Sequence, residues 1–369
     1  MSGEIISIEP RLPPAVCGTS TYGLMLSRHW PHSESRPRFL HLVVDGAEAS
    51  RRELGTADIH EVGRCASNLL SQMEEFPDAG VIVHYSSRGF HRFGIPLWLS
   101  RGLSRWRKRN PDARMLAFYH EVPQPLAMTS RHYILERINR TIIRRIARAA
   151  NVIATNTREH ATRLEEITWR RGVPCVPVPS NIPAPDHADG SFASRAAKDF
   201  AVFGLPFTQL LTLRYFEPEL ADWCKSGVIE RLHLIGPTDE KCAPQIDALL
   251  GRIFPPEAVI RHGTLPVDRV SEILSRVGFC LTQSNEGNFS KSGSFTAFAA
   301  HACAVVSRMK SGGEPFAHLI RPEEVAPAVQ RKDFAEFERR GFALREWYLR
   351  ESDWPVVAGR IRQMYEGGL

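Results

Sequence analysis

The chain has 369 residues, 43% of them hydrophobic and 24% charged, a composition typical of a soluble globular protein with room for two domains. The formal net charge of +6 favours anionic partners, and the absence of an 18-residue apolar run argues against a membrane span. The seven cysteines are scattered without a Cys-x-x-Cys pair, and no secretory signal pattern opens the chain, so we expect a cytoplasmic protein with reduced thiols.

Short apolar runs alternate with longer amphipathic patterns along the chain. Strands are predicted at 39–46, 80–86, 114–122, 151–157 and 174–180, and then at 200–205, 231–237, 258–265, 278–284 and 303–307. Helices are predicted at 59–76, 131–150, 158–166, 267–276 and 294–302. This alternation predicts an α/β protein built from βαβ units, with parallel sheets covered by helices.

A segment rich in Pro, Asp, Gly and Ser, PVPSNIPAPDHADGS (177–191), separates two such series and predicts a linker. We therefore expect two Rossmann-like domains, 1–178 and 179–344, facing each other across a cleft. Ligands of such folds bind at the carboxyl ends of the strands, so the loops there are the candidate sites. The remainder, 345–369, predicts two amphipathic helices broken near Asp353-Trp354-Pro355.

Arginines gather in 101–114 and 131–150. The second segment predicts a helix with isoleucine at every fourth position and arginine around the rest, namely Arg137, Arg140, Arg144, Arg145 and Arg148. This pattern is typical of a solvated helix face and also fits an anionic membrane surface, which leaves both interpretations open. No nucleic acid is expected as a partner, because no binding motif or interleaved aromatic residues accompany the arginines.

Several common motifs are missing. GTSTYGLM (18–25) has the glycine spacing of a phosphate-binding P-loop but lacks its Lys-Ser/Thr, and no G-x-G-x-x-G follows a predicted strand. Asp never occurs as D-x-D, and no His/Cys cluster is present. The sequence therefore predicts neither a metal site nor a bound cofactor.

The stretch NEGNFSKSGSFTAFAAHACAVVS (285–307) places a polar loop before a helix of small residues. A helix N-terminus offers free N–H groups and a partial positive charge. Lys291 would add a cation, Ser292 and Ser294 hydroxyl groups, and Gly293 a close backbone approach. The loop therefore suits a diphosphate, while a capped helix packed on the sheet is the alternative interpretation.

Five stretches together resemble one enzyme family. They are EPRLPPAVCGTSTYGLMLSRHW (9–30), AFYHEV (117–122), IARAANVIATNTREHATRLEE (146–166), VPVPSNIP (176–183) and VIRHGTLPVDRVSEILSRVGFCLTQSNEG (259–287). Together these five stretches resemble the corresponding segments of the GT-B glycosyltransferases, specifically the family-4-like (group 1) nucleotide-sugar-dependent transferases. The resemblance implies a nucleotide-diphospho-sugar as donor substrate in the second domain and a glycan or lipid-linked acceptor on the first. It also implies retention of configuration and a role in polysaccharide or glycoconjugate biosynthesis, in the cytoplasm or at the inner face of the membrane.

The resemblance implies catalytic roles for His120 and Glu286. For the last two helices it implies a crossing back to the first domain, anchored by Trp347, Tyr348 and Trp354. Contacts to the donor phosphates are implied for Gly18, Thr19, Arg214, Lys291, Ser292, Gly293 and Ser294. A core role for His120 and a solvated one for Glu286 are the alternatives.

The chain also departs from the family. The second glutamate of the family's E-x7-E motif would fall at Ala297, and the family's Arg/Lys pair is missing from FGLPFTQLL (203–211). Lys291 and Arg214 would have to replace that pair. The other interpretations are a catalytically degenerate GT-B-like binding protein and a nucleotide-sugar epimerase.

Overall fold

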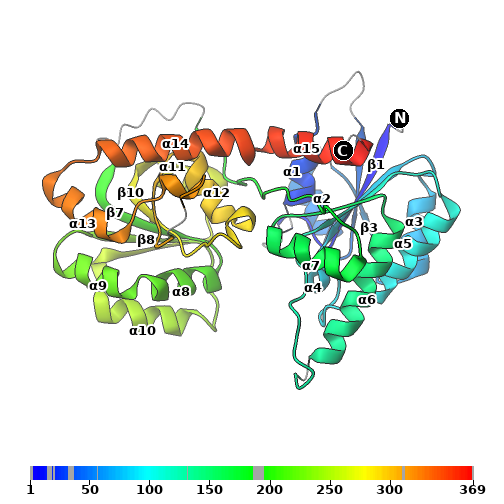
Figure 1. Cartoon of the computed structure of the whole chain (residues 1–369), viewed down its shortest axis with the longest axis horizontal. Coiled ribbons are helices and arrows are strands. Elements are labelled where there is room, and N and C mark those ends of the chain that lie inside the picture. Colours follow the sequence, from blue (N-terminus) through cyan, green and yellow to red (C-terminus); the bar gives the residue numbers. More distant parts are fainter. Residues whose placement is uncertain are drawn as a thin grey trace. The chain divides into compact units, whose positions relative to one another are not determined.

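The computed structural model describes residues 3–14, 19, 21–31, 37–55, 57–130, 132–185, 195–309 and 312–367. The chain divides into two compact units (Figure 1), unit 1 with Met1–Pro177 and Trp354–Leu369 and unit 2 with Val178–Asp353. Each unit contains one sheet whose strand pairs are all parallel, in the order β3-β2-β1-β4-β5-β6 in unit 1 and β11-β10-β7-β8-β9 in unit 2. The predicted α/β class with two Rossmann-like domains is thus confirmed.

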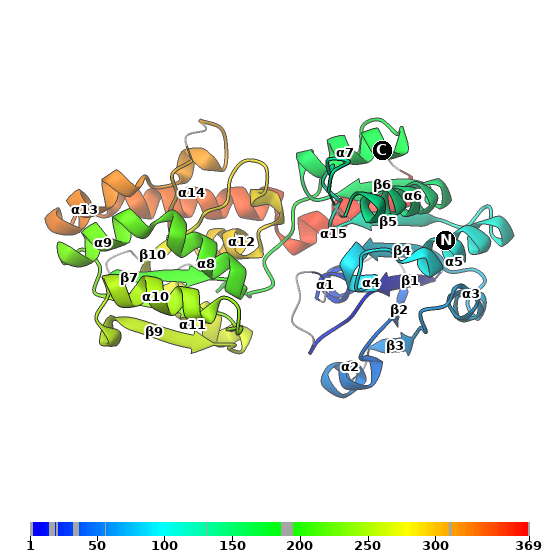
Figure 2. The same cartoon turned by 90° about the horizontal axis from the view of Figure 1, so that it is seen from below.

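Unit 1 is a sheet with helices on both faces (Figure 2). Its strands are β1 (Glu4–Glu9), β2 (Arg38–Val43), β3 (Asp58–Glu61), β4 (Gly80–Tyr85), β5 (Met115–Tyr119) and β6 (Val152–Thr155). Its helices are α1 (Tyr22–Arg28), α2 (Ala47–Leu54), α3 (Ala66–Glu74), α4 (Ser87–Phe90), α5 (Leu97–Arg109), α6 (Tyr133–Ala149), α7 (Arg158–Thr168) and α15 (Trp354–Glu366).

The main core of unit 1 lies where α5 packs between α3 and α6. Leu99, Leu103 and Trp106 point from α5 into this core because they share one helical face, and Ile142 and Ile146 do the same from α6. Elsewhere in the unit α15 contacts both α1 and β5, so the end of the chain is part of unit 1.

Unit 2 repeats this architecture. Its strands are β7 (Ala196–Phe203), β8 (Arg231–Ile235), β9 (Val259–Gly263), β10 (Val277–Leu281) and β11 (Ala304–Val306). Its α-helices are α8 (Pro206–Tyr215), α9 (Glu217–Lys225), α10 (Ala243–Ile253), α11 (Val267–Arg276), α12 (Gly293–Ala300), α13 (Pro322–Arg331) and α14 (Ala335–Glu351). Figure 1 shows α8, α9 and α10 on one side of the sheet and α11, α12 and α14 on the other.

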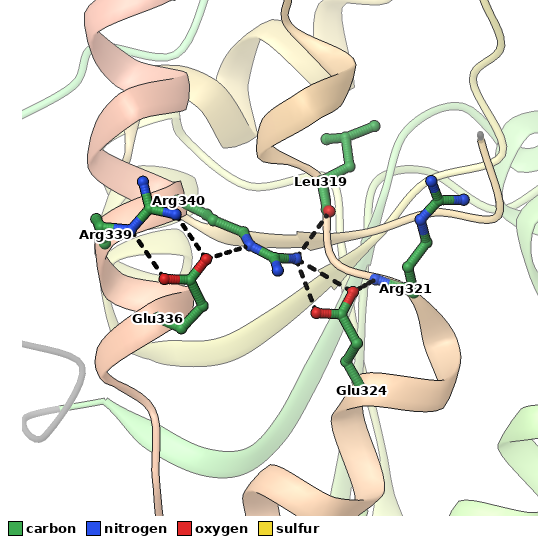
Figure 3. Close-up of polar contacts among 6 residues, drawn as sticks. All are labelled: Leu319, Arg321, Glu324, Glu336, Arg339 and Arg340. Carbon is green, nitrogen blue, oxygen red and sulfur yellow. Dashed lines mark hydrogen bonds and ion pairs between the residues drawn. The ribbon is translucent and has the colours of Figure 1, made fainter. Parts of the chain in front are cut away.

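An ion network joins α13 to α14 (Figure 3). Arg340 on α14 contacts Glu336 of its own helix at 2.8 Å and Glu324 of α13 at 2.9 Å, and it donates to the backbone oxygen of Leu319 at 3.3 Å. Hydrogen bonds from Arg339 and Arg340 lower the pKa of Glu336 to about 2. The network ties the start of α13 to α14.

The structure corrects several expectations about the elements. The unit boundary follows Pro177, one residue before the expected end of the first domain, and 345–369 is divided between the units instead of crossing over as a whole. Trp347 and Tyr348 are buried in a core of unit 2, whereas Trp354 packs on Tyr22 of unit 1. β1 and β3 were not predicted as strands, and 174–180 forms only an isolated bridge between Thr155 and Cys175.

None of the helices in the described part of the chain combines the length and the apolar character that crossing a bilayer requires.

Candidate functional site

The loop between β10 and α12 is the candidate donor site, and it is held in place by an aromatic anchor. Phe289 packs edge-on against Phe316 and Phe295, with ring centroids 4.8 and 5.9 Å apart. The backbone oxygen of Ser290 accepts a hydrogen bond of 2.7 Å from the N–H of Val178. These contacts fix the polar loop at the carboxyl edge of the sheet of unit 2.

The start of α12 presents backbone donors. Ser292 is the N-cap, and its hydroxyl oxygen accepts from the N–H of Phe295 at 3.2 Å. The preceding N–H groups, of Gly293 and Ser294, make no backbone hydrogen bond to another described residue. A Cβ at Gly293 would meet nothing within 4 Å, so no described protein atom crowds the first residue of α12 on that side.

Lys291 is exposed and forms no ion pair with the described residues. Ser292 is therefore a helix cap, as the alternative interpretation of the loop required, yet capping uses only one of the donors. The cap and a diphosphate site are compatible, because the cation and the two remaining N–H groups are not engaged.

The end of the neighbouring strand β7 lies beside the start of α12. Gly204 has φ +148°, a backbone conformation that strains other residues, and a Cβ there would lie 3.1 Å from the hydroxyl oxygen of Ser294, which favours glycine at this close approach. α8 begins directly afterwards, which brings a second helix N-terminus to this edge. The amide nitrogen of Gln209 donates to the backbone oxygens of Gly204 at 2.9 Å and Ile235 at 3.3 Å, which ties the ends of β7 and β8 together.

Sequence reasoning did not single out Gly204 or Gln209. The available signal was a glycine directly after each of two apolar runs, in FGLP (203–206) and LIGP (234–237).

Three residues implied by the resemblance fall in different places. Arg214 lies in the last turn of α8, about 12 Å along the helix from its first residue at 1.5 Å per residue, and bonds Gln245 at 2.7 Å. The structure therefore does not bring Arg214 to the loop. Glu286 is exposed within the loop, and Ala297 is fully buried on the inner face of α12.

His120 follows β5 at the carboxyl edge of the sheet of unit 1. It is only 5% exposed, and its Nε2 lies 3.2 Å from Nδ1 of His84. Its ring packs edge-on against Tyr22 at 4.7 Å. Burial lowers the pKa of His120 to about 3, so the imidazole is neutral at pH 7. Thr19 lies in the turn before α1, with its backbone oxygen bonded by the N–H of Tyr22, and Gly18 lies outside the described residues.

The outward face of α6 carries a cationic surface, called the α6 surface below. Arg144 stacks over Trp169 at 4.5 Å, and Ile134 and Trp169 are 71% and 66% exposed. Burial and the charges of neighbouring arginines lower the pKa of Arg144. Among the described residues the acidic partner of these arginines is Glu136, 3.4 Å from Arg140. The α6 surface comprises Arg137, Arg140, Arg144, Arg145, Arg148, Ile134 and Trp169 and includes a groove of about 250 Å³ along the helix.

No group of three His, Cys, Asp or Glu side chains that could hold a metal ion occurs among the described residues.

Comparison with known proteins gives matches at the level of structure. No protein-family model matches the sequence. No curated protein matches it either. HepE of Anabaena, solved in complex with UDP, superposes with a TM-score of 0.65 at 10% identity over 99% of this chain and 100% of that one. HepE has also been solved with UDP-glucose.

Two further solved structures cover nearly the whole chain. Sucrose-phosphate synthase of Thermosynechococcus elongatus gives a TM-score of 0.60 at 14% identity over 99% of this chain and 98% of that one. A glycosyltransferase of Rickettsia africae gives 0.62 at 10% identity with the same coverage, 99% and 98%. At these identities the likeness concerns the fold. The chain therefore has the GT-B glycosyltransferase fold, at low sequence identity to these structures.

Proposed function

We propose that the protein is a glycosyltransferase that transfers a sugar from a nucleotide-diphospho-sugar to a glycan or lipid-linked acceptor, without a bound metal or cofactor. Unit 2 binds the donor and unit 1 the acceptor. The reaction belongs to polysaccharide or glycoconjugate biosynthesis and retains the configuration of the sugar. The likeness to HepE, solved with UDP and with UDP-glucose, supports a nucleotide-sugar donor and favours uridine as its base.

The observation that carries the proposal is the group of donors at the carboxyl edge of unit 2. The N–H groups of Gly293 and Ser294 and the ammonium of Lys291 occur within four residues of chain, and Gly204 brings the end of β7 against Ser294. Backbone donors and helix dipoles suit the diphosphate of a donor. They compensate for the cation pair that is missing from 203–211.

The chemistry follows from this grouping. When the bond between sugar and diphosphate breaks, negative charge grows on the leaving diphosphate. Fixed N–H groups and Lys291 stabilise that charge without reorganising, which lowers the barrier. Glu286 binds a hydroxyl of the donor, and neutral His120 contributes a hydrogen bond in unit 1.

A second function, a binding protein without catalysis, is favoured by one observation. Ala297, at the position of the family's second glutamate, is wholly buried and has no acidic group to offer a sugar. Such a protein would still bind the nucleotide diphosphate.

We further propose that the α6 surface holds the protein at an anionic membrane, where a lipid-linked acceptor would be found. Its arginines have little acidic compensation within the described residues, and Ile134 and Trp169 add exposed apolar area beside them.

The test is ligand-dependent thermal stability followed by turnover. UDP, GDP and ADP are compared with their nucleosides, and a diphosphate at a hundred times its Kd should add about 2.7 kcal/mol to the free energy of unfolding. Release of nucleotide from UDP-sugars then separates an enzyme from a binding protein. Absence of stabilisation by any nucleoside diphosphate would contradict both functions.

A further inference from the structure

Polar and titratable side chains lie buried together within the sheet of unit 1. Ser7 and Glu9 point to one face of β1, and His41 of β2 pairs with Ser7 in register. His84 lies on β4 and Tyr22 at the start of α1. Together with His120 these side chains are at most 5% exposed: Ser7, Glu9, Tyr22, His41, His84 and His120. Burying so many polar groups is costly unless they are paired.

Two hydrogen-bonded groups account for part of the cluster. Oε1 of Glu9 accepts from the hydroxyl of Ser7 at 2.5 Å and lies 3.1 Å from Nδ1 of His41. Nδ1 of His84 and Nε2 of His120 form the second group, 3.2 Å apart. The ring of Tyr22 lies beside both histidines, with centroids 4.7 Å from His120 and 5.5 Å from His84.

Three enclosed atoms of the cluster have no hydrogen-bond partner among the described residues. They are Oε2 of Glu9, Oη of Tyr22 and Nε2 of His84. Buried polar atoms are nearly always paired, with protein or with ordered water. Glu9 and His84 are neighbours in the sheet, because the parallel register that pairs Ile8 of β1 with Val83 of β4 continues to them. Burial lowers the pKa of His84, and the nearby charge of Glu9 opposes that lowering.

The carboxylate of Glu9 sets the direction of the hydrogen bonds. An ionised carboxylate can only accept, so a ring nitrogen of His84 that faces it, directly or through a water, is favoured as N–H. With the proton on Nε2, Nδ1 of neutral His84 is an acceptor, and His120 must then donate from its own Nε2. The opposite arrangement would aim a lone pair of His84 at the carboxylate. Both rings are neutral at pH 7, because burial lowers the pKa of each to about 3.

We propose that Glu9, acting through His84, positions His120 as its Nε2–H tautomer, leaving Nδ1 as a hydrogen-bond acceptor at the carboxyl edge of the sheet. Nδ1 of His120 makes no hydrogen bond to the described residues, so it is available to a ligand. An acceptor there selects ligands that donate, and a sugar hydroxyl is the class that fits. The ligand class rests on the proposed role of His120 in sugar transfer; the tautomer does not.

Long-range proton–nitrogen NMR spectra of protein with nitrogen-15-labelled histidine test the tautomer directly at pH 7. Removal of one ring at a time, in His84→Phe and His120→Phe, assigns the signals. We expect both rings as the Nε2–H tautomer. A proton on Nδ1 of His120 in the wild type would overturn the proposal whatever the activity of the protein.

Variants then test the route from Glu9. In His84→Asn the amide oxygen can still accept from Nε2–H of His120, so the tautomer should persist, whereas in His84→Phe it should become mixed. Glu9→Gln should also give a mixture of the two tautomers, since an amide can donate to a ring nitrogen of His84 as well as accept from it. Glu4→Gln, on the same strand and paired with Arg38 at 3.3 Å, is the matched control and should change nothing. An unchanged tautomer in both His84→Phe and Glu9→Gln would contradict the route.

The effect on function is measured as kcat/KM for the release of nucleotide from a UDP-sugar. His84→Phe should lower kcat/KM at least tenfold and His84→Asn should restore most of it, with melting temperatures recorded for both. A confirmed tautomer without any turnover in the wild type would count against the proposed transferase alone. Equal loss in both variants would show that His84 serves only the fold.

Discussion

Lys291 is the only cationic side chain between β10 and α12, and its replacement tests the donor site at the scale of one residue. Lys291→Ala should weaken binding of UDP by about 1.5–3 kcal/mol, the range for a hydrogen bond to a charged group. That is about ten- to over a hundredfold in Kd, measurable by calorimetry. Uridine, which lacks the phosphates, should bind the variant and the wild type alike.

The neighbouring cap provides the contrasting variant. Ser292→Ala removes the bond to the N–H of Phe295 and should lower the free energy of unfolding by about 1 kcal/mol. Lys291→Ala should leave it nearly unchanged, because an exposed lysine contributes little to folding. If Lys291→Ala lowers the melting temperature but not the affinity for UDP, the loop is a structural cap only.

His84 and His120 should make unit 1 sensitive to acid. Their pKa values are about 3 in the fold and about 6.5 when unfolded, so between these values the unfolded chain binds more protons. The free energy of unfolding should therefore decrease as the pH is lowered through this range, by about 1.4 kcal/mol per pH unit for each ring. Denaturant titrations from pH 7 to pH 4 measure this decrease. For each pH unit, the free energy of unfolding of His84→Phe should decrease by about 1.4 kcal/mol less than that of the wild type, because the variant has one such ring fewer. Parallel curves would contradict the buried neutral state of His84.

The sequence indicated some of these residues and not their partners. AFYHEV (117–122) places His120 at the end of an apolar run and so marks it as a candidate, whereas GVIVHYS (80–86) predicts a strand and does not single out His84. The contact between the two exists because β4 and β5 pair in parallel, and one chain's sequence does not state which strands become neighbours. Arg214, expected at the donor phosphates, lies elsewhere for a related reason. The sequence does not state how far α8 carries it from the edge of the sheet where that helix begins.

At the scale of elements, α1 is seated on the buried cluster through Gly23. A Cβ at Gly23 would lie 1.9 Å from Oε1 of Glu9. Alanine is favoured over glycine in a helix by about 1 kcal/mol, but overpacking a core costs about 1–3 kcal/mol, and here it also displaces a buried carboxylate from Ser7 and His41. Gly23→Ala should therefore lower the free energy of unfolding in a denaturant titration.

Gly359 is the matched control. It lies within α15 of the same unit, and a Cβ there would meet nothing within 4 Å. Gly359→Ala should raise stability by about 0.4–1 kcal/mol. Equal effects of the two substitutions, in either direction, would show that α1 does not pack on Glu9 as described.

Elements with clean periodicity were the predictable ones. The helix expected at 267–276 coincides with α11, and that at 131–150 contains α6. β1 escaped prediction because Ser7 and Glu9 interrupt its apolar run, although both are buried. Within 174–180, Pro174, Pro177 and Pro179 cannot donate to a ladder, so this apolar run makes one bridge and no strand.

For the whole molecule, the proposed chemistry needs no divalent ion. The diphosphate charge is compensated by N–H groups and Lys291, so turnover and UDP binding should persist after dialysis against a chelator. Loss of both, restored by magnesium or manganese, would contradict this prediction.

The α6 surface makes a prediction about where the molecule resides. Each arginine near an anionic bilayer contributes about 1 kcal/mol of attraction, which salt screens. The protein should therefore co-sediment at low salt with vesicles of phosphatidylcholine and phosphatidylglycerol, and should be released at about 0.5 M salt, where the Debye length is only about 4 Å.

Reversing two exposed charges, in Arg137→Glu with Arg145→Glu, should abolish sedimentation. The same reversal on unit 2, in Lys225→Glu with Arg276→Glu, keeps the net charge equal and should leave most of the binding in place. Equal loss in both pairs would mean that overall charge, not the α6 surface, governs binding. Sedimentation with pure phosphatidylcholine would contradict an electrostatic contact, and no sedimentation with either vesicle would leave the arginines as the solvated face of α6.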